Sequence, residues 1–330
     1  MLGFSVLISF YIVFYLVLMI GWKAIRKNKN KTIDSKINPS EVTVIIPFRN
    51  EYENLIHLIE KISTLKTVPC RFLFINDHSE DNWRDLFIDS NRDLIEVISL
   101  EKERQGKKAA VQKGVESSSS KFILSWDADI DFEIDYFNQI QQIDSADLVI
   151  LPVLFKSKNY WQSLGEIDFY LANFINQTSA YWKRPIMCNG ANLLFKRKAY
   201  LDVINLKEHE HILSGDDMFL LKKMNQERKE INLVSDACSV STSSADTFRG
   251  YLKQRTRWIG KSFYIQDNLL NFWAGLQFLF AISFFVLFTY YAIQDLQLFV
   301  LFLTIKSAID VIFLSFYFKS INKNLLTLFI

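Results

Sequence analysis

The feature that most constrains this chain is a run of apolar residues near its beginning. Residues 2–22 carry no charge and are dominated by Phe, Ile, Leu, Val and Tyr, and about 20 such residues let a helix cross a bilayer. A second run spans residues 270–292, and a third, interrupted by Lys306 and Asp310, spans residues 298–318. The stretch between the first two runs has an ordinary globular composition. The sequence therefore predicts a globular domain held between membrane segments.

The first run is interpreted either as a membrane anchor or as a cleavable signal peptide. Its positive charges follow the apolar stretch, and no small-residue cleavage pattern is present, which favours the anchor. The basic residues that follow it are Lys23, Arg26, Lys27, Lys29 and Lys31. Because positive loops stay in the cytoplasm, we expect a multi-pass protein of the cell membrane with its globular part on the cytoplasmic face. The last two runs would form a hairpin.

Charge and cysteine content exclude some functions. With 38 Lys and Arg against 36 Asp and Glu, the net charge is +2, and no basic stripe interleaved with aromatic residues suggests nucleic acid as a partner. Cys70, Cys188 and Cys238 are widely spaced and odd in number. This pattern fits a reducing compartment better than a disulfide framework.

From residue 41 onward, short apolar runs alternate with helical patterns, which is typical of an α/β domain with a mostly parallel sheet. The predicted strands are residues 42–47, 71–75, 94–98, 121–126 and 147–153. The predicted helices include residues 82–88, 107–116, 134–143, 161–182 and 247–263. The last two are rich in aromatic residues, so they lie either at a membrane surface or, for 161–182, in an ordinary core. We divide the chain into an N-terminal anchor (1–23), a basic linker (24–40), the globular domain (41–265) and a C-terminal hairpin (266–330).

Three predicted strands end in polar clusters, at residues 48–51, 76–79 and 127–129. Each cluster by itself could be a helix cap or a turn. Ligands of such sheets bind beyond the carboxyl ends of the strands, and several carboxylates at that edge would normally need a cation. Asp127 and Asp129 form a D-x-D pair that suits Mg²⁺ or Mn²⁺, with phosphate oxygens completing the coordination.

Two adjacent acids, Asp216 and Asp217, precede a helical run at residues 218–224. One of them could cap that helix. Their mutual repulsion also raises the proton affinity of one carboxylate, which suits a general base for an acceptor hydroxyl.

A basic motif lies shortly before the second apolar run. Gln254 and Arg257 are three residues apart, hence on one helix face, with Trp258 beside them. A guanidinium binds a diphosphate in a forked geometry, and an indole offers a flat surface for a sugar. The alternative is a basic helix that contacts lipid phosphates, and both interpretations can hold together.

The order of these clusters resembles the family 2 glycosyltransferases of GT-A fold. It particularly resembles their membrane-bound branch, which includes ceramide glucosyltransferase and the hyaluronan and cellulose synthases. Residues 44–51 look like the opening strand and donor loop, and Asp77 looks like the uridine-contacting aspartate. Residues 106–110 are similar to the family's Gly-Lys-x-x-Ala segment, and residues 189–192 to its donor-sugar and acceptor segment. The sequence from 254 to 258 matches its Q-x-x-R-W signature.

Two positions depart from the family pattern. Asn76 stands where many members have a second Asp, which leaves Asp77 as the functional residue, and Arg49 replaces a frequent Tyr or Cys. The second departure puts the donor preference in question.

The resemblance implies a nucleotide-sugar-binding, Rossmann-like fold flanked by transmembrane helices, and an inverting transfer from a UDP-sugar. Asp217 would be the base, and Asp127 and Asp129 would hold the metal. The residues implied to bind the donor are Pro47, Arg49, Glu51, Asp77, Lys107, Asp127, Asp129 and Gly190. Those implied to bind the acceptor and diphosphate are Asp216, Gln254, Arg257 and Trp258.

The flanking spans favour a lipid or lipid-linked acceptor at the membrane surface. The alternatives are a processive polysaccharide synthase, whose channel normally needs more than three helices, and a non-catalytic scaffold, against which the intact acids argue. Lys306 and Asp310 are spaced to pair within the last span, where ionisable side chains usually face protein or a polar cavity. They would mark helix packing, an oligomer contact or a path for a lipid head group.

Overall fold

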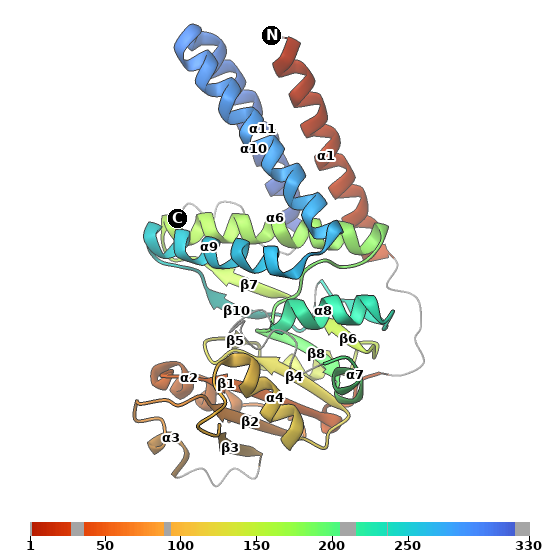
Figure 1. Ribbon diagram of the computed structural model, residues 1–330, viewed down its shortest axis with the longest axis vertical. Helices are drawn as coiled ribbons and strands as arrows, with labels where there is room; N and C mark the ends of the chain where they lie inside the picture. Colours follow the sequence, from red (N-terminus) through yellow and green to blue (C-terminus); the bar gives the residue numbers. More distant parts are fainter. Residues whose placement is uncertain (1, 28–35, 89–93, 205–215, 236, 321–330) are drawn as a thin grey trace. The chain divides into compact units, whose positions relative to one another are not determined.

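The structure, a computed structural model, describes residues 2–27, 36–88, 94–204, 216–235 and 237–320 (Figure 1). The chain divides into two compact units. The sheet unit contains Asn30–Lys156 and Met187–Ser244, and the helical unit contains Met1–Lys29, Ser157–Ile186 and Ala245–Ile330.

The sheet unit is built on a mostly parallel sheet of seven described strands in the order β3-β2-β1-β4-β8-β6-β9. The strands are β1 (Val42–Phe48), β2 (Arg71–Asn76), β3 (Ile95–Ser99), β4 (Phe122–Trp126), β6 (Leu148–Ile150), β8 (Asn192–Lys196) and β9 (Ile231–Leu233). β1 pairs in parallel with both β2 and β4, whereas β8 runs antiparallel to β4 and β6. The predicted α/β class with a mostly parallel sheet is confirmed.

A second, three-stranded sheet corrects one predicted strand. Residues 147–153 do not form a single strand, because β6 ends at Ile150 and a separate strand β7 (Val153–Lys156) follows Pro152. A proline has no N–H to donate to a ladder, and β7 instead pairs with β10 (Val240–Ser243), which also pairs with β5 (Asp131–Phe132).

Six described α-helices complete the sheet unit. They are α2 (Tyr52–Ile62), α3 (Asp85–Ile88), α4 (Lys107–Ser117), α5 (Tyr136–Ile140), α7 (Arg197–Val203) and α8 (Asp216–Gln226), and a 3₁₀ turn, η2 (Pro39–Glu41), precedes β1. α3 and α5 are shorter than predicted. α4 packs directly on β1, because a Cβ on Gly114 would lie 2.6 Å from Ile45 Cγ2. This close contact holds α4 against β1.

The helical unit contains α1 (Leu2–Lys27), α6 (Tyr160–Trp182), α9 (Phe248–Ile265), α10 (Asn268–Gln294) and α11 (Leu296–Ser320). Three of its described helices are long and apolar enough to cross a membrane, namely Gly3–Ala24, Asn268–Gln294 and Leu296–Phe316. They coincide with the three predicted apolar runs.

α6 is packed along the first of these helices. Thr178 Oγ1 donates a hydrogen bond to the Leu18 carbonyl (3.0 Å), and a Cβ on Gly21 would lie 2.7 Å from Thr178 Cγ2. The Trp22 and Phe174 rings stack at 5.8 Å. The middle of α6 is thus a core helix, while Tyr160 and Trp182 at its ends are exposed. The compact units consequently differ from the predicted domains, since residues 157–186 and 245–265 group with the membrane helices.

Lys306 and Asp310 take part in helix packing. Lys306 Nζ contacts Asp310 Oδ2 at 2.5 Å within α11, and Asp310 Oδ1 accepts hydrogen bonds from the hydroxyls of Tyr11 (2.8 Å) and Tyr15 (3.2 Å) on α1. The ammonium also lies over the Tyr11 ring at 5.7 Å. Of the three interpretations drawn from the sequence, packing between α1 and α11 is the one that these contacts support.

We expect Asp310→Ala to lower the free energy of unfolding by about 2 kcal/mol, because it leaves the Lys306 charge uncompensated among apolar helices. Thermal unfolding of the detergent-solubilised protein measures this. The double variant Lys306→Met, Asp310→Leu removes both charges and should recover most of the loss. A single variant as stable as the wild type would contradict this role.

Candidate active site

The loops after β1 and β2 are tied together at the edge of the sheet. Asn50 N–H donates to Ser79 Oγ (3.0 Å), and Glu80 N–H donates to Asn50 Oδ1 (2.8 Å). Asn50 and His78 have left-handed backbones with φ of 55° and 56°, a conformation that Asn and His adopt more readily than most residues. Because β1 and β2 are parallel and Pro47 is in register with Ile75, the polar clusters at residues 48–51 and 76–79 lie side by side. Pro47 is buried in β1, and Arg49 is exposed just after it.

Asp77 connects this edge to α4. The side chain is buried, and both of its carboxylate oxygens accept a hydrogen bond from Gly106 N–H at 3.0 Å. Gly106 has φ of 91°, which favours glycine. Asp77 therefore fixes the backbone immediately before Lys107. Its implied contact with uridine stays a prediction.

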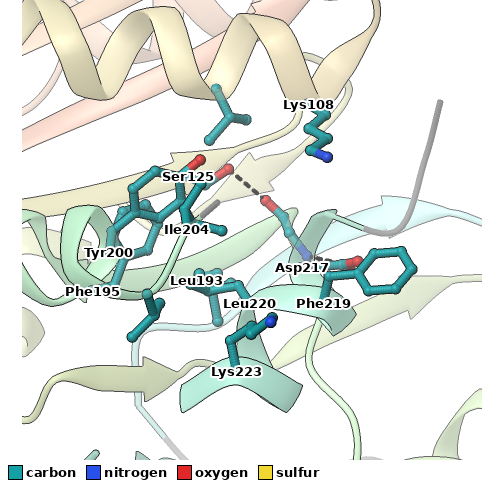
Figure 2. Close-up of a pocket in the computed structure, with 13 residues that line it drawn as sticks. Lys108, Ser125, Leu193, Phe195, Tyr200, Ile204, Asp217, Phe219, Leu220 and Lys223 are labelled. Carbon is teal, nitrogen blue, oxygen red and sulfur yellow. Dashed lines mark hydrogen bonds between the residues drawn. The ribbon is translucent and has the colours of Figure 1, made fainter. Parts of the chain in front are cut away.

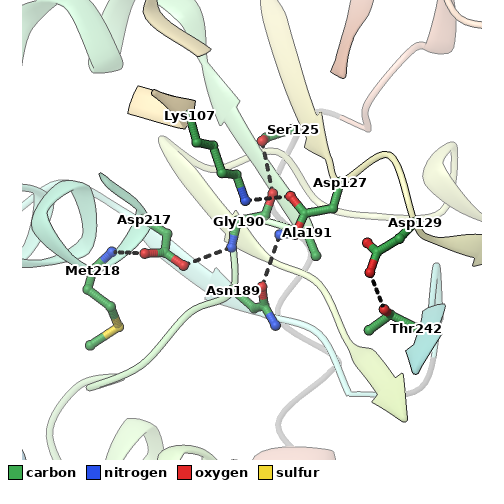
Figure 3. A network of polar contacts seen from close by, with 10 residues as sticks. All are labelled: Lys107, Ser125, Asp127, Asp129, Asn189, Gly190, Ala191, Asp217, Met218 and Thr242. Atoms are coloured by element: carbon green, nitrogen blue, oxygen red, sulfur yellow. Dashed lines mark hydrogen bonds and ion pairs between the residues drawn. The ribbon is translucent and has the colours of Figure 1, made fainter. Parts of the chain in front are cut away.

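Lys107 and the D-x-D pair meet in the centre of the site (Figure 3). Lys107 Nζ forms an ion pair with Asp127 Oδ1, and each side chain is 33% exposed. Asp129 Oδ2 accepts a hydrogen bond from Thr242 Oγ1 of β10 (3.0 Å). The second sheet thus orients one carboxylate of the pair, a contribution that no sequence motif indicated.

The negative charges of neighbouring carboxylates make ionisation of Glu51 and Asp129 less favourable. Burial raises the pKa of Glu51, and the charges of Asp129, Asp127 and Asp81 add to this, against a lowering hydrogen bond from Asn54. Burial also raises the pKa of Asp129, and the charge of Asp127 raises it further. Acids that raise one another's pKa in this way form a site where a cation is favourable.

A hard divalent ion fits this donor set. Among the described residues, no group of three or more His, Cys, Asp and Glu side chains is placed to hold a metal ion. We expect Asp127 and Asp129 to bind the ion together with oxygens from a ligand, as Mg²⁺ sites that include substrate phosphates do.

Asp217 lies in the first turn of α8 and faces the same region. Its Oδ2 accepts a hydrogen bond from Gly190 N–H (3.0 Å), and its Oδ1 accepts one from Met218 N–H (2.8 Å). A Cβ on Gly190 would lie 3.2 Å from Lys107 Nζ and 3.5 Å from Asp217 Cβ, so Gly190 lies between these two side chains (Figure 3). Asp217 thus carries a helix-terminal hydrogen bond and also faces the site. The Asp216 side chain lies outside the described residues.

The Q-x-x-R-W residues belong to α9 of the helical unit. Gln254 and Trp258 are half-buried and Arg257 is exposed, and the Trp258 ring lies 6.1 Å from that of Phe169 on α6. The sheet unit therefore carries the predicted donor residues together with Asp216 and Asp217, and the helical unit carries Gln254, Arg257 and Trp258.

Arg255, which lies within the Q-x-x-R-W motif, was not among the residues predicted from the sequence to have a role. Its guanidinium forms an ion pair with Asp168 of α6 and lies 5.4 Å from the centre of the Trp258 ring. Burial lowers the pKa of Arg255 to about 10, so it stays charged at neutral pH. Tyr251 donates to the same carboxylate (3.1 Å). In the sequence, the i, i+4 spacing of Tyr251 and Arg255 indicates that the two side chains share a helix face, but it does not identify Asp168 as their common partner.

Comparisons with known proteins agree with this geometry. Residues 43–203 match the family model described as glycosyl transferase family 2. The chain contains a family 2 glycosyltransferase domain. It is 25% identical over 212 residues to poly-beta-1,6-N-acetyl-D-glucosamine synthase of Staphylococcus aureus strain COL, and 24% identical to the same enzyme of strain MSSA476. Each alignment covers 62% of this chain and 51% of the relative, so the match spans about half the length of these relatives.

A solved structure supports the fold of this family 2 domain. The mannosyltransferase PcManGT from Pyrobaculum calidifontis, in complex with GDP-Man and Mn²⁺, superposes with a TM-score of 0.55 at 18% identity. The superposition covers 77% of this chain and 72% of the mannosyltransferase. At this identity the likeness shows the fold alone.

A pocket lies on one side of Asp217 in the sheet unit (Figure 2). Its walls are largely apolar side chains from β8, α7 and α8, with lysines of α4 and α8 nearby, and they include Leu193, Phe195, Tyr200, Leu220, Lys108 and Lys223. Segments that are distant in the sequence form this pocket, so it could not be predicted from the sequence alone.

One residue of the predicted donor-sugar segment is instead part of the core. Asn192 is fully buried, and its Oδ1 accepts hydrogen bonds from Trp126 Nε1 (3.3 Å) and the Tyr136 hydroxyl (2.6 Å). Its Nδ2 donates to the carbonyls of Pro152 and Cys238, both at 2.8 Å. This amide therefore joins the end of β4, which carries the D-x-D pair, to the second sheet.

Replacing Asn192 by Ala should lower the free energy of unfolding by about 3 kcal/mol, because it leaves buried donors and acceptors unsatisfied. Urea unfolding followed by circular dichroism measures the loss. Asn189→Ala is a matched control, since the Asn189 side chain is only half-buried and bonds within its own loop. Equal stability of the two variants would show that the hydrogen bonds of the Asn192 side chain do not stabilise the fold.

Proposed function

We propose that the chain is a metal-dependent, inverting glycosyltransferase that moves a sugar from a UDP-sugar to a lipid or lipid-linked acceptor at the cytoplasmic face of the cell membrane. The observation that carries this proposal is the convergence of Asp217, Gly190, Lys107 and Asp127 in the sheet unit.

The proposed reaction is a single displacement. Asp217, oriented by the N–H groups of Gly190 and Met218, takes the proton from an acceptor hydroxyl. The acceptor oxygen then forms a bond to the anomeric carbon as the bond between that carbon and the diphosphate oxygen breaks. Asp127 and Asp129 would hold a divalent ion, which stabilises the charge of the departing nucleoside diphosphate when bound. Glu51, Asp77 and Arg49 would hold the nucleoside.

Several features support a membrane acceptor. The helical unit combines the three candidate spans with α6 and α9, and Arg257 and Trp258 of α9 would bind the diphosphate and the acceptor. The basic residues after the first span favour the cytoplasmic orientation. A membrane-bound acceptor would thus be presented beside the helices that anchor the enzyme.

A second candidate is a processive polysaccharide synthase, in which the acceptor is the growing glycan. The observation that favours it is the similarity to the Staphylococcus aureus poly-beta-1,6-N-acetyl-D-glucosamine synthase. The length of the product separates the two reactions, because single transfer yields one added sugar per acceptor.

The decisive experiment measures nucleoside diphosphate release by the detergent-solubilised full chain. A panel of UDP- and GDP-sugars is offered with Mg²⁺ or Mn²⁺, with and without membrane lipid extract, and products are sized by mass spectrometry. We expect release that depends on the metal and increases with lipid. Long products formed without lipid would favour the processive synthase, and absence of donor binding under every condition would favour a non-catalytic scaffold.

A further inference from the structure

The ammonium group of Lys107 lies among the acids that would receive a metal. It pairs with Asp127 Oδ1, its charge acts on Asp129, and it would be 3.2 Å from a Cβ on Gly190. It therefore stands between the predicted metal ligands and Asp217 (Figure 3).

The backbone beneath this side chain is fixed and the side chain itself is long. Both oxygens of Asp77 hold Gly106 N–H at 3.0 Å, and α4 begins at the next residue. A lysine carries a compact charge on a flexible four-carbon stem with three donors that can rotate. Lys107 can thus exchange one anionic partner for another without moving the helix.

A phosphate group is a suitable second partner. A lysine binds phosphate as a point charge, and a nucleoside diphosphate in this site would bring anionic oxygens close to Asp127 and Asp129. With the ammonium on those oxygens, the Asp127 carboxylate would be released toward a divalent ion. Without the nucleotide, the Lys107 ammonium is the cation that compensates the charge of the Asp127 carboxylate.

We propose that Lys107 is a positioning residue that takes the place of the divalent ion while the donor is absent, so that metal and nucleotide enter the site together. This inference rests on the proposed function, because it requires a nucleoside diphosphate as the ligand. It assigns Lys107 a role in the order of binding in addition to a contact with the donor.

The test measures Mn²⁺ binding to the detergent-solubilised full chain by electron paramagnetic resonance of the free ion. Without nucleotide, Lys107→Met and Lys107→Gln should each bind Mn²⁺ about tenfold more tightly than the wild type, because a positive charge beside the ligands is gone. Lys107→Arg keeps the charge and should bind as weakly as the wild type. Addition of UDP or GDP should tighten binding in the wild type and reduce its difference from Lys107→Met.

Lys113→Met is the matched control, since Lys113 also lies on α4 and pairs with a carboxylate, that of Glu101. It should leave Mn²⁺ affinity unchanged, and thermal unfolding of every variant verifies the fold. Equal Mn²⁺ affinity of Lys107→Met, Lys107→Gln and the wild type without nucleotide would overturn the inference, while nucleotide-promoted binding would still support the proposed function. Absence of Mn²⁺ binding in all variants, with or without nucleotide, would overturn both.

Discussion

The variant Asp217→Asn is expected to lower the rate of sugar transfer by about 1,000-fold, within the range that a positioned general base contributes. The amide cannot take the proton of the acceptor hydroxyl, yet its oxygen can still accept the hydrogen bond from Gly190 N–H. Donor binding should therefore change little, so the loss should appear in kcat rather than in the KM for the donor. Product formation under saturating donor measures it.

Asp202→Asn provides the control for this experiment. Asp202 is an exposed acid of α7 in the same unit, and it pairs with Lys229 at 3.5 Å. Its replacement should leave the rate unchanged. An Asp217→Asn protein with full transferase activity would remove Asp217 from the mechanism and leave the metal site as the remaining support for the proposed reaction.

Asp129→Asn should have an effect nearly as large, because it removes one of two predicted protein ligands of the metal. We expect metal-dependent nucleoside diphosphate release to fall by about 100-fold or more. The variant should also be at least as stable as the wild type when no metal is added, because burial and the charge of Asp127 already disfavour ionised Asp129. Such opposite effects on activity and stability are typical of functional sites.

Asp131→Asn is the matched control, since Asp131 lies two residues further on and pairs with Lys61 and Lys156. It should keep metal-dependent activity. A stable Asp129→Asn protein that retains full activity at limiting Mn²⁺ would show that this carboxylate is not a metal ligand.

Much of the fold could be predicted because it depends on local patterns. Apolar runs of sufficient length, two of them uncharged and the third charged only at Lys306 and Asp310, indicated the three candidate spans. The spacing of buried residues in α2, and the apolar runs that became β1, β2 and β4, are equally local. The D-x-D pair was indicated by its position after a strand, since strand ends define the binding edge of an α/β sheet.

Other features required the tertiary structure because they join segments far apart in the chain. Pro152 separates β6 from β7, but only pairing with β10, almost 90 residues later, turns β7 into part of a second sheet. The same long-range packing places Thr242 on Asp129 and buries Asn192 in the core.

The sequence by itself therefore determined the candidate membrane spans, the α/β class and the presence of the acidic motifs, because apolar length, periodicity and motif order are properties of the linear sequence. Only the tertiary structure decided which charges meet. It paired Lys107 with Asp127, Asp310 with two tyrosines of α1, and Arg255 with Asp168. Such partners are selected by three-dimensional proximity and by the need to compensate charges removed from water, and neither is visible in residue spacing.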